Sequence, residues 1–176
     1  KAIGCELTIP NGNVISMVRN LLLAGADPLG VDICDGVFET PLEAAMERKS
    51  IELIQLLLEF GARVTQGAFV QAVHHCDITV VKLLLNSGGK VTEPVIECAV
   101  EHNSILVFFL LEAADNIIKT RCKTAAFIKS IECMKMAVIK ELGASGAQLI
   151  RNSKLEYAIQ QVIEAGNMEV LIFLLD

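Results

Sequence analysis

The stretch His74-His75-Cys76-Asp77 carries the densest set of metal-binding groups in the chain, because imidazoles, thiolates and carboxylates are the ligands that Zn²⁺ prefers. Four consecutive side chains diverge around a turn, however, whereas a tetrahedral site needs ligands that converge on one point. His102 follows His75 by 27 residues (102 − 75) and could lie beside it if the chain repeats at that interval. We therefore interpret the stretch as a polar turn with a surface histidine pair, and we predict no metal and no other cofactor.

No catalytic motif is found in the sequence. Nucleophilic catalysis needs a base and an orienting group beside the nucleophile, and none of the common hydrolase, metalloprotease or phosphate-loop patterns occurs. The glycine-rich segment Gly143-Ala144-Ser145-Gly146-Ala147 lacks the Lys-Ser/Thr ending of a phosphate-binding loop and follows an expected helix rather than a strand. The sequence therefore predicts that the protein is not an enzyme.

A constant interval of 27 residues organises the chain (72 − 45, 99 − 72, 126 − 99), and an alanine marks each copy: Ala45, Ala72, Ala99 and Ala126. In the first three copies the alanine is followed by a polar break and then by an apolar run that ends in two leucines. Apolar residues within these runs recur every three to four positions, which is the spacing of an amphipathic helix and not of a strand. Each unit is thus predicted to be a short helix, a turn and a longer helix.

Glycines and prolines stand where such helices would end and begin. Pro41 and Pro94 occupy expected first turns, where a missing N–H is harmless. Glycine accepts the left-handed conformation of a helix C-cap, and four glycines follow apolar runs: Gly25, Gly61, Gly88 and Gly143. A first helix this short cannot bury its apolar side alone, so neighbouring units are expected to stack.

Three segments carry a resemblance to a known family: Leu21-Leu22-Leu23-Ala24-Gly25-Ala26-Asp27-Pro28, Thr40-Pro41-Leu42 with Ala44-Ala45, and Leu56-Leu57-Leu58-Glu59-Phe60-Gly61-Ala62. They look like the ankyrin repeat, with Glu43 at the position of the histidine in the family's Thr-Pro-Leu-His motif. The resemblance implies an all-α, ankyrin-like α-solenoid of stacked helix-turn-helix repeats. Because the family's unit is about 33 residues long and the step here is shorter, most β-hairpin fingers are expected to be shortened or missing.

The whole chain is predicted to be a single ankyrin-like repeat domain and to belong to a larger protein. Its 176 residues would hold units at approximately 1–36, 37–66, 67–93, 94–120, 121–154 and 155–176. The segments 26–39 and 144–154 are long enough to project as fingers, on either side of a middle with almost none.

Composition limits the compartment and the partners. Six cysteines at irregular spacings, with no C-x-x-C pair, indicate reduced thiols and a cytoplasmic or nuclear location. A formal net charge of −6 disfavours nucleic acid as a partner, and we interpret the basic cluster of Lys119, Arg121, Lys123 and Lys129 as a solvated face. The most apolar run, Ile105 to Leu111, is far shorter than the roughly 20 residues that span a bilayer, so no membrane segment is predicted.

The resemblance also implies a recognition surface, since ankyrin domains commonly bind partners on the concave side formed by the finger tips and first helices. The candidate partner-binding residues are Asp35, Phe38, Glu39, Glu43, Glu47, Gln71, His74, Glu97, Glu101 and Arg151. Phe38, near a finger tip, is a candidate anchor, unless it folds back onto its own stack. Four of the glutamates fall in equivalent columns and would form an acidic stripe that favours a basic partner, unless the stripe is a plain solvated surface.

We therefore expect a protein–protein interaction module that presents a concave, partly acidic surface to a protein or peptide. The alternative is an internal regulatory or structural arm that packs on an enzyme domain of the same polypeptide. A third hypothesis, a small-molecule, metal or catalytic site housed in the repeats, has no motif in its favour.

Overall fold

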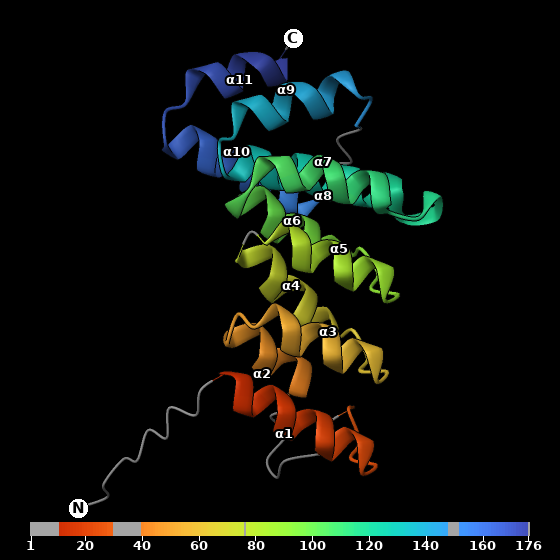
Figure 1. Cartoon of the computed structure of the whole chain (residues 1–176). Coiled ribbons are helices and arrows are strands. Elements are labelled where there is room, and N and C mark those ends of the chain that lie inside the picture. The colour runs from red at the N-terminus through yellow and green to blue at the C-terminus, as the bar shows by residue number, and fades with distance from the viewer. Residues whose placement is uncertain (1–10, 30–39, 76, 148–151, 176) are drawn as a thin grey trace, which may run out of the picture. The chain divides into compact units, whose positions relative to one another are not determined.

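The computed structural model describes residues 11–29, 40–75, 77–147 and 152–175 (Figure 1). These residues form eleven α-helices and no strand, which confirms the all-α class for the described part of the chain. The helices are α1 (Asn11–Leu23), α2 (Pro41–Glu47), α3 (Ile51–Glu59), α4 (Gln66–His74), α5 (Ile78–Asn86), α6 (Glu93–His102), α7 (Ser104–Ala113), α8 (Asn116–Glu132), α9 (Met136–Ala144), α10 (Ser153–Glu164) and α11 (Met168–Leu175). Residues 30–39 and 148–151, which belong to the two expected finger segments, fall outside the described residues.

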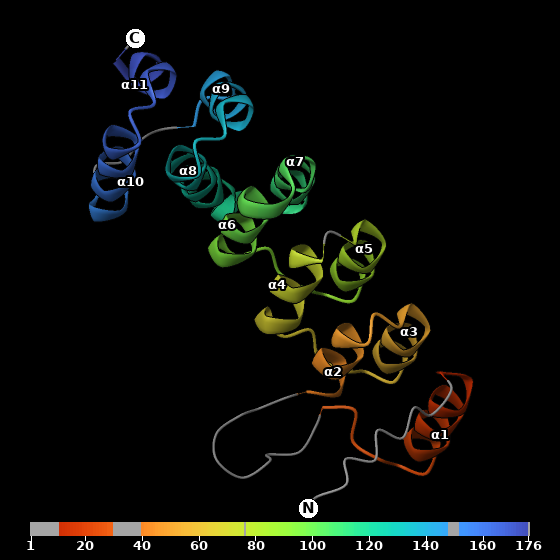
Figure 2. The ribbon, with the colours of Figure 1, turned by 90° about the vertical axis from the view of Figure 1, so that its left-hand side faces the viewer.

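The chain divides into two compact units, Lys1–Ala68 and Phe69–Asp176. The division falls within α4. The first unit holds α1 and the helix pair α2–α3, and the second holds α5 together with the pairs α6–α7, α8–α9 and α10–α11. In the second unit the first helices α6, α8 and α10 lie on one side and the second helices α7, α9 and α11 on the other (Figure 2). Helix α8 packs against both α6 and α10.

Side-chain caps explain where several helices begin. The hydroxyl of Thr40 accepts the backbone N–H of Glu43, and the Glu43 carboxylate accepts the backbone N–H of Thr40, so α2 opens with a capping box followed by proline. Asp77 accepts the N–H groups of Thr79 and Val80 in α5, and Asn152 accepts the N–H of Leu155 in α10. Polar residues at these positions therefore cap the N-termini of the helices that follow them.

The repeating columns form the core. Every alanine of the 27-residue series is at most 2% exposed: Ala45, Ala72, Ala99 and Ala126. A matching column of leucines in the second helices is equally buried: Leu57, Leu84, Leu110 and Leu142. The periodicity seen in the sequence thus marks the positions at which helices pack, as expected for a helical repeat.

The glycine C-caps are confirmed at three of four positions. Gly25, Gly61 and Gly88 have φ angles of 93°, 86° and 86°. The prediction for Gly143 is wrong, because Gly143 lies inside α9 and the residue with positive φ after this helix is Gly146. A side chain at Gly143 would crowd Phe173, whose Cζ lies 3.2 Å from the position of an added Cβ, so the glycine serves close packing here rather than a turn.

Helix α8 is longer than the other first helices. It has 17 residues, and the unit boundary expected between residues 120 and 121 falls within it. Only Ala114 and Asp115 separate it from α7, so an additional helical stretch occupies the sequence that would otherwise form a link. The extension lets α8 carry both Arg121 and Lys129 alongside α6.

Candidate recognition surface

Three glutamates lie on one face of α6 at four-residue intervals, Glu93, Glu97 and Glu101, and we refer to them as the α6 carboxylate row. Residues at positions i and i+4 are neighbours on a helix surface, so the row runs along the helix. The sequence places Glu97 and Glu101 in an acidic stripe open to a partner. The structure adds that every member of the row forms an ion pair within the chain.

The cations come from α8 and α10. Arg121 Nη2 lies 2.7 Å from Glu93 Oε1, and Lys129 Nζ lies 2.6 Å from Glu101 Oε1. From the first turn of α10, Lys154 Nζ reaches Glu97 Oε1 at 2.7 Å. The charge of the row is therefore largely balanced by the chain itself.

Exposure differs between the partners of these pairs. The side chain of Arg121 is 74% exposed and that of Glu93 34%, and the corresponding values are 63% for Lys154 and 27% for Glu97. In the Lys129 pair the order is reversed, with 18% for Lys129 and 43% for Glu101. Arg121 and Lys154 thus present positive charge outward, above carboxylates that lie deeper.

Lys129 is the centre of a small network. Its Nζ also lies 3.1 Å from Glu132 Oε1, and Lys135 Nζ donates to the backbone oxygen of Glu101 at 3.0 Å. Burial opposes protonation of Lys129, but the hydrogen bonds and charges of Glu101 and Glu132 outweigh it and raise its pKa above the ordinary value of 10.5. The Lys129 side chain is therefore held in its charged, ammonium form.

Three hollows adjoin along this surface, and together we call them the α8 groove. The largest, about 370 Å³, lies between the Arg121–Glu93 pair and Lys154. A second of about 290 Å³ shares Glu93 and Arg121 with it, and a third of about 140 Å³ shares Ile128 and Lys154. The groove is thus bounded by first helices of three successive pairs.

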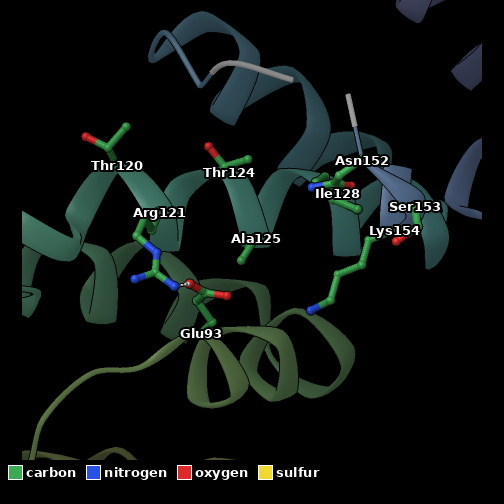
Figure 3. A pocket seen from close by; sticks show the side chains of 9 residues that line it. All are labelled: Glu93, Thr120, Arg121, Thr124, Ala125, Ile128, Asn152, Ser153 and Lys154. Carbon is green, nitrogen blue, oxygen red and sulfur yellow. Dashed lines mark ion pairs between the residues drawn. The ribbon is translucent and has the colours of Figure 1, made fainter. Parts of the chain in front are cut away.

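The largest hollow has a charged and hydroxylated rim over an apolar floor (Figure 3). Arg121 and Lys154 stand at its two ends and extend from α8 and α10 toward α6. Ala125 and Ile128 of α8 supply the apolar atoms between them. Thr120 and Ser153 add hydroxyl groups to the lining.

Cys122 lines the second hollow but is not an activated nucleophile. It is fully buried. Burial and, to a lesser extent, the nearby Glu93 carboxylate raise the pKa of its thiol, while Arg121 acts in the opposite direction. The side chain is held as the thiol, which is the weakly nucleophilic form.

The three histidines gather at the C-terminal ends of α4 and α6. The rings of His74 and His102 lie 4.4 Å apart between centroids, and those of His74 and His75 5.4 Å apart. The sequence predicts a pair of His75 with His102, whereas the structure places His74 beside His102. Residue 76 is outside the described part, within which no group of three or more His, Cys, Asp or Glu side chains could hold a metal ion.

The remaining predicted partner-binding residues have varied positions. Glu43 serves the capping box and also accepts the Thr65 hydroxyl at 2.7 Å, whereas Glu47 is exposed. Gln71 is half-buried, and its Oε1 has no hydrogen-bond partner among the described residues. Four candidates lie outside the described residues: Asp35, Phe38, Glu39 and Arg151.

Sequence reasoning missed the residues that bound the groove, chiefly Arg121, Lys154 and Tyr157. One signal was available. Arg121 and Lys129 are separated by eight residues (129 − 121), the same interval as Glu93 and Glu101 (101 − 93). Two helices that carry opposite charges at the same interval can form ion pairs along their length. A basic face that only contacts solvent would not need its charges at that interval.

None of the helices in the described residues is long and apolar enough to cross a membrane. Comparisons with protein-family models, with curated proteins and with solved structures found no match for this chain.

Proposed function

We propose that this chain is a protein-interaction module of the ankyrin-like solenoid type, and that it binds a segment of a partner protein in the α8 groove. The observation that carries the proposal is the series of adjoining hollows along α6, α8 and α10. An apolar floor with a polar, charged rim is the usual composition of a protein-binding surface. Tyr157, which is 54% exposed at one end of the groove, is a side chain of the type that often anchors a partner.

The ankyrin-like assignment is supported by the helix pairs, the buried 27-residue columns and the Thr40-Pro41 capping box. An ankyrin-like recognition surface needs its first helices on one side, and the first helices of the second unit share one side (Figure 2). A location in the cytoplasm or nucleus is part of the same proposal and rests on the cysteine pattern.

The expected preference for a basic partner stays a separate prediction. Glu47 is exposed and forms no ion pair within the described residues, so it is available to a basic group. Glu97 and Glu101 are engaged by Lys154 and Lys129. A basic partner would have to displace these lysines before it could use the carboxylate row.

A peptide-display selection tests the proposed function. The intact chain is used to select binders from a random peptide library, and the selected peptides are measured against Ala125→Trp and Ala113→Trp. Ala125 lines the largest hollow, whereas Ala113 is exposed at the end of α7, outside the groove. Because the chain has no tryptophan, each variant also carries its own fluorescent reporter of folding.

We expect Ala125→Trp to weaken the selected peptides by about tenfold or more, and Ala113→Trp to leave the Kd within about twofold. Failure to enrich any peptide, or equal binding by the two folded variants, would refute recognition in this groove.

The alternative of an internal arm is favoured by a different observation. Ile131 at the end of α8 is fully buried, whereas its counterpart in α10, Ile163, is 59% exposed. Ile172 and Leu175 of α11 are 54% and 86% exposed. This end of the second unit therefore presents apolar side chains that suit packing against further protein.

A photo-crosslinking amino acid at position 172 tests this alternative in the polypeptide as it occurs in its source. A crosslink to another region of the same polypeptide would support the internal arm. If the photo-activated group is only quenched by water, or crosslinks only to unrelated proteins, the internal arm is refuted.

A further inference from the structure

The largest hollow of the groove lies between Arg121 and Lys154, and its charges favour some bound segments over others. The deeper members of its two ion pairs are the carboxylates Glu93 and Glu97, and the outer members are the cations. A group that enters from solvent therefore meets the guanidinium and the ammonium first. Charge complementarity between such a rim and a ligand contributes to specificity.

Both cations retain the capacity to bind a second acceptor. A guanidinium carries five N–H donors and an ammonium three, whereas the structure uses the Arg121 side chain for Glu93 and the Lys154 side chain for Glu97. Hydrogen bonding to Glu97 also raises the pKa of Lys154, so this side chain stays charged. An incoming acceptor can thus be bound without loss of the existing pairs.

The rest of the lining suits a short acidic side chain. Thr120 and Ser153 contribute neutral hydroxyl donors, and Ala125 and Ile128 can contact methylene groups. The hollow adjoins the first turn of α10, where the backbone dipoles add a further, smaller preference for negative charge. A single carboxylate is favoured over a more highly charged group, because Glu93 and Glu97 remain nearby and repel added negative charge.

We infer that the hollow between Arg121 and Lys154 receives an aspartate or glutamate side chain of the bound segment. This inference rests on the proposed function and adds the chemistry of the partner to it. It also opposes, for this part of the surface, the basic partner predicted from the acidic stripe.

The test uses a fluorescein-labelled octapeptide with one central glutamate in an otherwise uncharged alanine and serine sequence, and a matched octapeptide with glutamine at that position. Binding to the intact chain is followed by fluorescence anisotropy at low ionic strength, where exposed charges are least screened. We expect the glutamate peptide to bind at least about fivefold more tightly than the glutamine peptide. Equal binding of the two peptides, or no binding of either, would overturn the inference.

Charge variants place the site. Arg121→Gln with Lys154→Gln should weaken the glutamate peptide by about tenfold. Lys140→Gln is the matched control, because Lys140 is also exposed and also forms an ion pair, with Glu169 at 3.2 Å, but lies outside the groove. If Lys140→Gln weakens binding as much per charge removed as the double variant does, the attraction comes from the overall charge of the protein and the inference fails.

A variant with the opposite expected sign strengthens the test. Glu97→Gln frees Lys154 and removes a repelling carboxylate, so it should tighten the glutamate peptide by about threefold. Unchanged or weaker binding by this variant, with its fold verified by circular dichroism, contradicts the arrangement described here.

The outcome can be separated from that of the proposed function. If the display selection yields peptides that require the groove but contain no aspartate or glutamate, recognition stands and the acidic side chain is refuted. If the selection yields no groove-dependent peptide, the proposed function itself fails.

Discussion

The carboxylate of Glu43 accepts the hydroxyl of Thr65 at 2.7 Å, across 22 residues of sequence. The same carboxylate accepts the backbone N–H of Thr40 at 3.1 Å, and the Thr65 oxygen accepts the N–H of Ala68 at 3.1 Å. One side chain therefore connects the N-terminal caps of α2 and α4 within the first unit. Glu43 thereby ties the start of α4 to the start of α2.

Replacement of Glu43 by alanine should destabilise the protein. It removes one half of the capping box and a hydrogen bond to a charged acceptor, and we expect a loss of about 1–3 kcal/mol. The measurement is urea unfolding followed by circular dichroism. Glu47→Ala is the control on the same helix, and it should change stability by less than about 0.5 kcal/mol because Glu47 is exposed. Equal effects of the two substitutions would contradict the linking role of Glu43.

Thr92 is expected to behave in the opposite way to Thr65. Thr92 is the N-cap of α6, but its side chain makes no capping bond, and its Oγ1 is buried with no partner among the described residues. Replacing a buried, unpaired hydroxyl by a methyl group removes a desolvation cost of about 1–3 kcal/mol. Thr92→Val should therefore leave the free energy of unfolding unchanged or raise it, whereas Thr65→Val should lower it by about 1–2 kcal/mol. A clear loss of stability in Thr92→Val would show that the hydroxyl is bonded.

Lys129 should contribute stability that depends on pH. Its pKa is raised in the folded protein, so the contribution is fully present below the unfolded value of 10.5 and is lost as the pH rises through the folded-state pKa. Near neutral pH, Lys129→Met should cost about 1–3 kcal/mol. The difference between wild type and variant should shrink in alkaline solution above pH 10.5.

Lys140→Met serves as the control for this titration, since Lys140 is 58% exposed and its pair with Glu169 should be worth less than about 1 kcal/mol. A difference between wild type and Lys129→Met that does not change with alkaline pH would show that packing, and not charge, explains the effect.

The leucine column offers a comparison between two successive second helices. Leu142 is 1% exposed, whereas Leu174, at the same position of α11, is only partly buried. Leu142→Ala should cost about 2–5 kcal/mol, and Leu174→Ala clearly less, in thermal or urea unfolding. Similar costs would mean that Leu174 is covered in solution.

Much of the fold was predictable because repetition is visible in one dimension. The alanine and leucine columns are a direct record of helix packing, since a residue that meets the same neighbours in every unit is constrained in the same way. The capping box of Thr40 and Glu43 could also be read from its four-residue pattern, although the resemblance led us to place Glu43 among the partner-binding residues.

The groove was not predictable in the same way. Glu97 and Lys154 are separated by 57 residues, and their contact depends on how successive helix pairs turn relative to one another, which no local pattern encodes. The start of α8 was also missed, because Asp115 caps it without a side-chain hydrogen bond and no proline or glycine marks the position. Gly143 was misassigned because a glycine that packs closely against Phe173 looks the same in sequence as one that adopts a turn conformation.

The four-residue spacing of the α6 carboxylate row limits how this region can change in evolution. Each residue added to a helix turns all later side chains by about 100°, so an insertion between Glu93 and Glu97 would leave Arg121 and Lys154 facing different sides of α6. A substitution removes one pair, whereas a single inserted or deleted codon would disrupt several at once. Related chains should therefore vary in residue type along α6 while keeping its length.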